Sequence, residues 1–232
     1  MTIVYLYTAL CTVGGADRSI IQKANYLADE MHQDVFIITD SQKKRPPVFP
    51  ISPRIRHIDI AIDFDRQYHH NLLVRGYYYF TLMHLYRKKL EYWLKTLKPD
   101  IVISTLGREL DFLTQLDDGS VKIGESHIAK PYTRNLHLME QRGFPYKQIA
   151  RYWRKKQEEA VKKLDALVVL TQHDADNWKE VKKACVIPNF LPFSPEKGSS
   201  CLEKRIISIG RYSEQKGYDR LIEAWIKVNR KH

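Results

Sequence analysis

The segment 205–225 combines residue types that suit an anionic ligand. Residues 206–209 are mostly apolar, and the loop that follows them carries Arg211 and Lys216. This order predicts a strand, a cationic loop and the start of a helix after Gly217. Two positive side chains and the unpaired N–H groups of a helix start attract phosphates. The segment therefore predicts a binding site for a phosphorylated ligand.

A second candidate site lies near the beginning of the chain, where Gly14 and Gly15 follow an apolar run at residues 3–7. Small residues in the first strand–helix loop let the backbone approach a ligand closely. The spacing G-x-G-x-x-G is absent, so a dinucleotide site is not indicated. A plain tight turn before the helix is the alternative interpretation of these glycines.

Polar side chains also follow later apolar runs. Glu125 and His127 come directly after one run, and Ser104 and Arg108 lie at the end of another. The carboxyl ends of parallel strands share the edge at which open α/β sheets bind ligands. Arg108 is therefore a candidate for contact with an anionic acceptor, with helix capping or solvent exposure as the alternative for this pair. For His127 the alternative is an ordinary surface position.

These residues need a sheet to bring them together, and the hydrophobic pattern predicts one. Apolar runs at 3–7 and 35–39 flank a stretch with apolar residues at helical spacing, 20–31. Such a βαβ unit favours a parallel sheet with helices on its faces. Further strands are expected at 58–62, 100–104, 121–124 and 166–170, with 185–189 closing the series, and helices at 72–97, 109–116, 146–163 and 174–180.

The expected fold class is α/β, a Rossmann-like doubly wound parallel sheet followed by the first strand and helix of a second domain. Residues 1–190 form the first domain in this interpretation. Residues 191–204, which contain prolines, serines and a glycine, form a linker. Residues 205–232 begin the second domain.

Composition limits the partners and the compartment. The formal net charge is +11, with 38 Lys and Arg against 27 Asp and Glu, which favours an anionic partner. Three widely spaced cysteines without a CxxC argue against a disulfide framework or a zinc site and fit a reducing cytosol. No apolar run reaches the roughly 20 residues of a spanning helix, so a soluble or membrane-surface protein is expected.

Four motifs together resemble glycosyltransferase family 4, retaining enzymes of the GT-B fold that use nucleotide-sugar donors. They are Gly14-Gly-Ala-Asp-Arg18, Val168-Val-Leu-Thr171, Val186-Ile-Pro-Asn189 and Ile209-Gly-Arg-Tyr-Ser-Glu-Gln-Lys-Gly217. The resemblance covers the N-terminal half and the first edge of the family's two-domain body. It implies that acceptor binds mainly on the first domain and donor mainly on the second.

The resemblance also implies roles for individual residues. Arg211 and Lys216 match the positions that hold the donor diphosphate, where fixed cations compensate the leaving nucleoside diphosphate without a bound metal. His127 would orient the reacting sugar or stabilise charge, with Glu125 as its orienting partner. No cofactor is implied beyond the nucleotide-sugar substrate.

The remaining matched positions lie around the cleft. Gly14 and Gly15 match a loop near the donor's sugar and phosphate and beside the acceptor. Thr171 and Asn189 match positions at the cleft floor and the interdomain crossover, and Asn189 after Pro188 is expected to fix a turn rather than touch substrate.

Two aromatic and basic helices make an anionic membrane surface a further expected partner. The first contains Tyr77–Phe80, Arg87–Lys89 and Tyr92-Trp93, and its apolar members are expected to pack on the sheet. The second, around Arg151–Lys156, is expected to attract anionic lipid. Such a surface would suit a polyprenyl-linked or lipopolysaccharide acceptor and a peripheral location on the inner face of the cytoplasmic membrane.

The leading hypothesis is a hexosyltransferase acting on a polysaccharide or lipid-linked acceptor in capsule or lipopolysaccharide biosynthesis. The family's E-x7-E pair, which engages the donor, does not occur in this sequence. Weak or absent transfer by the isolated chain is therefore expected, unless a separate chain completes the second domain. The alternatives are an inactive acceptor- or membrane-binding module and a nucleic-acid-binding protein; the last ranks low because no nucleic-acid-binding signature accompanies the charge.

Overall fold

The computed structural model describes residues 1–69, 71–179, 181, 183–191, 193, 196, 198, 200, 202–203, 205–210, 212 and 216–229. The chain divides into two compact units, Met1–Phe190 and Leu191–His232.

The first unit is built on a seven-stranded, all-parallel sheet in the order β3-β2-β1-β4-β5-β6-β7. The strands are β1 (Thr2–Tyr7), β2 (Asp34–Thr39), β3 (Arg56–Asp59), β4 (Ile101–Ser104), β5 (Val121–Glu125), β6 (Ala166–Val169) and β7 (Ala184–Val186). The parallel α/β sheet predicted from the sequence is confirmed. Strand order reverses between β1 and β4, which makes the carboxyl edge there a topological switch point.

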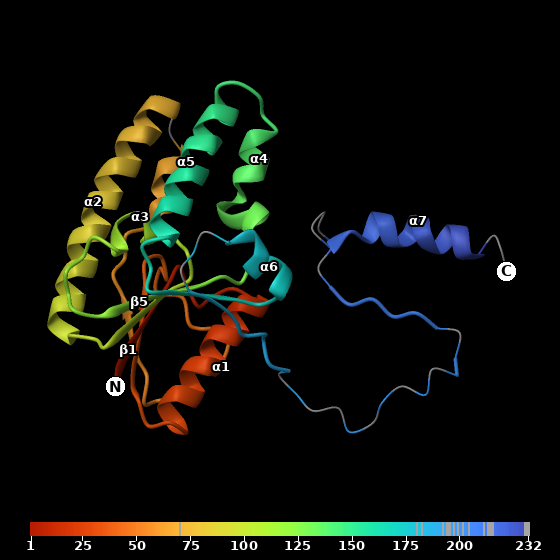
Figure 1. Ribbon diagram of the computed structural model, residues 1–232, viewed down its shortest axis with the longest axis horizontal. Helices are drawn as coiled ribbons and strands as arrows, with labels where there is room; N and C mark the ends of the chain where they lie inside the picture. The colour runs from red at the N-terminus through yellow and green to blue at the C-terminus, as the bar shows by residue number, and fades with distance from the viewer. Residues whose placement is uncertain are drawn as a thin grey trace. The chain divides into compact units, whose positions relative to one another are not determined.

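Helices connect these strands (Figure 1). The α-helices of the first unit are α1 (Gly15–Asp29), α2 (Leu72–Leu97), α3 (Leu110–Leu113), α4 (Leu136–Glu140), α5 (Tyr146–Val161) and α6 (Gln172–Asn177). Two 3-10 segments, η1 (Phe64–His69) and η2 (Lys130–Asn135), precede α2 and α4.

The long helix α2 shows why this sequence folds locally as it does. Asn71 caps its start, because the side-chain oxygen accepts a hydrogen bond from the backbone N–H of Val74 at 3.0 Å. It ends at Lys98, whose left-handed backbone (φ 45°) precedes Pro99. One stripe of the helix is buried on the sheet, formed by Leu82, Tyr86, Leu90 and Leu94 against Val4, Leu6, Phe36, Ile38 and Val102.

The opposite face of the sheet has less cover. Helix α1 buries Ile20, Ile21 and Ala24 there against β1 and β2. Next to α1, apolar residues of β4, β5 and β6 remain only partly buried, and a hollow of about 550 Å³ opens over them. Its apolar lining includes Ile103 and Ile123.

The described part of the second unit contains one helix, α7 (Tyr218–Asn229), which follows Gly217 as predicted. The predicted strand at 206–209 was wrong: residues 205–210 form no strand, and Ile206, Ile207 and Ile209 are exposed. The N–H and C=O groups of a strand stay unpaired unless a neighbouring strand forms hydrogen bonds with them. Among the described residues, no strand pairs with this segment.

Candidate functional site

The first strand–helix loop lies at the carboxyl edge of β1, where the chain turns into α1. Gly14 is the N-cap of α1, and a Cβ atom there would collide with the carboxylate of Asp17. A Cβ on Gly15 would meet open space. Thr12 Oγ1 donates a hydrogen bond to Asp17 Oδ1 at 2.6 Å. Asp17 therefore closes the loop against the helix start, and only the position of Gly14 is sterically restricted.

Tyr7 links this loop to the sheet. Burial, and after it the neighbouring carboxylate of Asp17, raise the pKa of the Tyr7 hydroxyl. The phenol thus stays protonated at the end of β1. Sequence analysis assigned no role to Tyr7 or to Asp17, although an acidic residue in the first turn of α1 is a visible signal of helix-start electrostatics.

His127 lies two residues after the end of β5, and its side chain is only 6% exposed. Burial lowers the pKa of this imidazole below its ordinary value, and the opposing charge of Glu125 only partly offsets the effect. His127 Nε2 lies 3.5 Å from Glu125 Oε1. Because the ring is neutral near pH 7, this approach is not an ion pair, and both ring nitrogens have no hydrogen-bond partner among the described residues.

Glu125 also pairs with a lysine through the same oxygen, Oε1. Its carboxylate forms an ion pair with Lys23 of α1, and both residues line the hollow beside that helix. Tyr5 stands at the same hollow, and its pKa is raised by burial and by the charge of Glu125. The expected His127–Glu125 neighbours are thus brought together, and Lys23 completes a group that spans α1 and β5.

Polar groups of the loop after β4 form hydrogen bonds with one another. Ser104 Oγ is buried and donates to Glu109 Oε1 at 2.6 Å, and the N–H of Gly107 donates to the same oxygen at 3.0 Å. The guanidinium of Arg108 lies over the ring of Phe64, 4.5 Å from its centroid. Ser104 therefore holds the loop, whereas Arg108 is partly exposed at the edge.

A buried carboxyl group that the sequence did not single out lies nearby. Burial raises the pKa of Asp40, at the end of β2, to about 7; Ser41 and Arg108 lower it, while Glu109 and Asp59 raise it further. Several acidic groups therefore share the edge formed by β2, β3 and β4. Among the described residues, no group of three or more His, Cys, Asp or Glu side chains is arranged to hold a metal ion.

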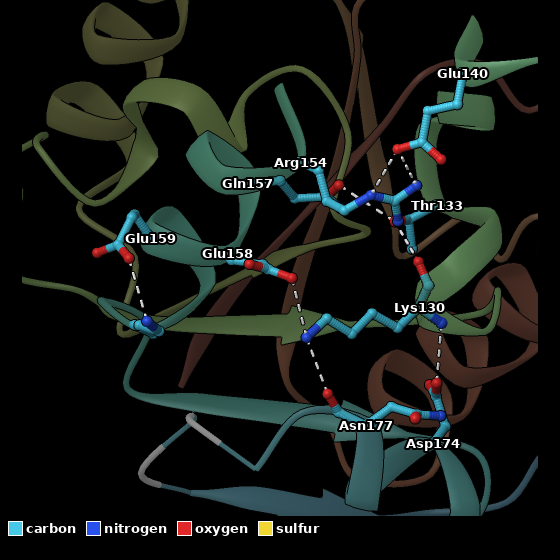
Figure 2. Close-up of polar contacts among 10 residues, drawn as sticks. Lys130, Thr133, Glu140, Arg154, Gln157, Glu158, Glu159, Asp174 and Asn177 are labelled. Carbon is cyan, nitrogen blue, oxygen red and sulfur yellow. Dashed lines mark hydrogen bonds and ion pairs between the residues drawn. The ribbon is translucent and has the colours of Figure 1, made fainter. Parts of the chain in front are cut away.

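The segment that follows His127 is fixed to α5 and α6 by Lys130 (Figure 2). Its backbone N–H donates to Asp174 Oδ1 at 3.0 Å, and its Nζ donates to the carbonyl of Asn177 at 2.9 Å. The same Nζ lies 3.1 Å from Glu158 Oε1 and 4.7 Å from the ring centroid of Trp178. One lysine thus anchors the connection on two helices.

Further pairs hold the rest of this connection. Arg154 Nη2 lies 3.0 Å from Glu140 Oε1, and Thr133 Oγ1 donates to Gln157 at 3.2 Å (Figure 2). Local sequence does not predict these contacts, because the partners are 14 and 24 positions apart in the chain. The loop beside His127 is consequently held from several sides.

The structure describes three of the four remaining predicted positions. Thr171 caps α6 by accepting a hydrogen bond from the N–H of Asp174 at 3.1 Å, and Asn189 is exposed after β7. Lys216 is exposed in the second unit. Arg211 lies outside the described residues.

Comparison with solved structures places this architecture. Apo WaaB, a lipopolysaccharide outer core galactosyltransferase, matches with 12% identity and a TM-score of 0.53, over 82% of this chain and 46% of that one. Sucrose-phosphate synthase from Thermosynechococcus elongatus matches with 12% identity and a TM-score of 0.54, over 81% and 47%. Os79 from O. sativa in complex with UDP matches with 14% identity and a TM-score of 0.54, over 83% and 52%.

The fold is that of the Rossmann-like domains of GT-B glycosyltransferases. At these identities the similarity shows the fold alone. The chain spans about half the length of the solved chains it matches. No protein-family model and no curated protein sequence matches it.

Proposed function

We propose that this chain forms the acceptor-side part of a glycosyltransferase that takes its sugar from a nucleotide-sugar donor. The observation that carries the proposal is the buried, neutral His127 with two unpaired ring nitrogens at the carboxyl edge of the sheet. Buried polar atoms without partners cost free energy unless a ligand satisfies them. A sugar hydroxyl, which both donates and accepts hydrogen bonds, suits a neutral imidazole.

In this proposal His127 orients the transferred sugar. Glu125, with its charge compensated by Lys23, lies 3.5 Å from the imidazole and does not attack the anomeric carbon, and the sugar is transferred with retention as in family 4. Arg211 and Lys216 compensate the leaving nucleoside diphosphate, with no bound metal. The UDP named in the description of Os79 supports a nucleotide donor.

The proposed acceptor is a glycan or a polyprenyl-linked sugar of cell-surface polysaccharide assembly, and the proposed location is cytoplasmic. Its approach would be from the edge that carries Gly14, Gly15 and Arg108. A module that binds acceptor without transfer is the second candidate. It is favoured by the exposed, strandless 205–210 segment and the exposed Lys216.

Both candidate functions require that His127 contacts a sugar ligand, and NMR of the imidazole resonances in the full 1–232 chain tests this contact. A panel of UDP-sugars and glycan acceptors should shift the His127 ring resonances, and His127→Ala should lower affinity about tenfold through the lost hydrogen bond. His84→Ala, which changes an exposed histidine of α2, is the matched control and should bind normally. Unshifted His127 resonances with every ligand would contradict both candidates.

Release of UDP then separates the two candidates. Turnover of a nucleotide-sugar in the presence of acceptor supports the transferase, and sugar binding without UDP release supports the module. A second chain that supplies the donor half would restore release in the transferase only.

A further inference from the structure

The starts of α2 and α5 and the loop between α4 and α5 lie at one end of the first unit (Figure 1). Helix α2 leads into β4 and α5 leads into β6, so both helices begin at the carboxyl edge of the sheet. The rings of Tyr79 and Trp153 meet edge to face with centroids 5.4 Å apart. The N-terminal halves of the two helices are therefore in direct contact.

Aromatic side chains are exposed around this contact. Phe80 meets Tyr79 at 5.8 Å and Tyr152 meets Trp153 at 5.6 Å, which makes a row of four rings across the two helices. Phe80 is 70% exposed, Tyr152 is 63% exposed, and Phe144 in the preceding loop is 86% exposed. Large apolar rings gathered at an exposed end are typical of a surface that meets another phase or partner.

The same end is strongly cationic. Residues 66–90 and residues 141–157 contain no Asp or Glu. Lys147, Arg151 and Lys155 follow one another at helical spacing on the exposed side of α5, and none forms an ion pair with any residue that the structure describes. Their charge is thus not compensated within the described protein.

We propose that this end binds the surface of an anionic lipid bilayer. The helix-tip surface consists of Phe80, Phe144 and Tyr152 with Lys147, Arg151 and Lys155. The cations complement the lipid phosphates and the rings enter the headgroup region, the division of roles seen in interfacial amphipathic helices. No helix in the described part of the chain is long and apolar enough to cross the membrane, so the contact is peripheral.

In the C-terminal part of α2 the apolar stripe is buried rather than exposed, so the proposed membrane contact is confined to the N-terminal part of this helix. There Leu82, Tyr86 and Leu90 are buried against the sheet. The helix-tip surface lies at the same sheet edge as His127, so a lipid-anchored acceptor in the bilayer would be presented to the candidate site. That consequence rests on the proposed function, whereas bilayer binding does not.

Vesicle flotation of the full chain tests the proposal. The protein should float with vesicles of phosphatidylcholine mixed with phosphatidylglycerol and remain below with phosphatidylcholine alone. The triple variant Lys147→Glu, Arg151→Glu and Lys155→Glu should lose affinity at least ~100-fold. Phe144→Ser, which leaves the charge unchanged, should lose about tenfold.

The matched control carries the same change in charge at the opposite edge. Lys163 and Lys183 precede β6 and β7, and Lys179 lies shortly before β7; all three are exposed. The triple variant Lys163→Glu, Lys179→Glu and Lys183→Glu should retain most vesicle affinity. Circular dichroism establishes that each variant is folded before binding is compared.

Several results would overturn the proposal. Equal losses in the two triple variants would mean that net charge alone drives binding, and full binding by Phe144→Ser would remove the role of the ring. Binding of the wild type to a single-stranded oligonucleotide but not to anionic vesicles would replace the bilayer with nucleic acid. Loss of nucleotide-sugar binding with flotation intact would instead contradict only the proposed function.

Discussion

Two segments of this chain have the same sequence order, an apolar run, a glycine-containing loop and an amphipathic helix. Residues 2–29 form β1 and α1, and β1 pairs with β2 on one side and β4 on the other. In residues 206–229 the helix α7 forms, while 206–209 form no strand. The difference lies in what each backbone needs from its neighbours.

A helix satisfies its own hydrogen bonds, so α7 can form where no partner is described; the N–H of Leu221, for example, donates to the carbonyl of Gly217 at 3.0 Å. A strand cannot satisfy its N–H and C=O groups alone. Local sequence therefore predicts a helix more reliably than a strand whose partners lie elsewhere.

The largest contrast is expected between buried and exposed apolar side chains. Leu90 of α2 is fully buried against the sheet, whereas Ile222 of α7 is 56% exposed. Leu90→Ala should lower the free energy of unfolding by ~2–5 kcal/mol through lost burial and a residual cavity. Ile222→Ala should change it by less than about 0.5 kcal/mol. Urea unfolding followed by circular dichroism measures both, and similar losses would show that α7 is packed after all.

The buried carboxyl group of Asp40 should make the free energy of unfolding depend on pH, whereas an exposed carboxyl group should not. Because the pKa of Asp40 is raised to about 7, the folded state keeps a proton that the unfolded state releases near pH 4. Its contribution to stability is therefore present below pH 4 and is lost as the pH rises through 7. The loss is on the order of 4 kcal/mol at most.

Replacement of Asp40 should make the free energy of unfolding depend less steeply on pH. Asp40→Asn should remove most of its share of the stability loss between pH 4 and pH 8, because asparagine imitates the protonated carboxyl. Asp219→Asn, at the exposed start of α7, is the control and should leave the profile unchanged. Unfolding curves across this pH range measure the slope, and parallel profiles for wild type and Asp40→Asn would refute the assignment.

The sequence predicted the elements of the first unit well and the contacts between them poorly. The expected helix at 72–97 coincides with Leu72–Leu97, because a cap signal and a Lys-Pro stop mark its ends. Alternation and apolar runs located the strands, and strand ends placed His127 at the correct edge. These signals are local, so a single sequence contains them.

The missing information is non-local. Lys23 and Glu125 are 102 positions apart, and the sequence around either residue does not predict their ion pair. The pKa of Asp40 is raised mainly because the fold buries this carboxyl group, and Glu109 and Asp59, from a loop and another strand, raise it further. The strand predicted at 206–209 fails for the same reason, since its formation depends on partners rather than on its own residues.

A smaller effect on stability is expected from the comparison of two lysines, one partly buried and one in an exposed ion pair. Lys130 is partly buried and joins Asn177 and Glu158, whereas Lys162 pairs with the exposed Glu159. Lys130→Met should cost about 1–2 kcal/mol and speed amide hydrogen exchange in the segment after His127. Lys162→Met should cost less than about 0.5 kcal/mol. Unchanged exchange in Lys130→Met would show that other contacts hold the segment.

The smallest effect is expected from removal of the second unit. The fragment 1–190 retains all seven paired strands and the three buried clusters, none of which includes a residue beyond 190. Its free energy of unfolding should match that of the full chain within about 0.5 kcal/mol, because the described residues removed with the second unit are exposed, apart from the half-buried Gly217 and Tyr218. Urea unfolding of the two chains under identical conditions makes the comparison. A marked loss in the fragment would mean that the second unit packs on the first, and the contrast between the two strand–helix segments would then concern their hydrogen bonding alone.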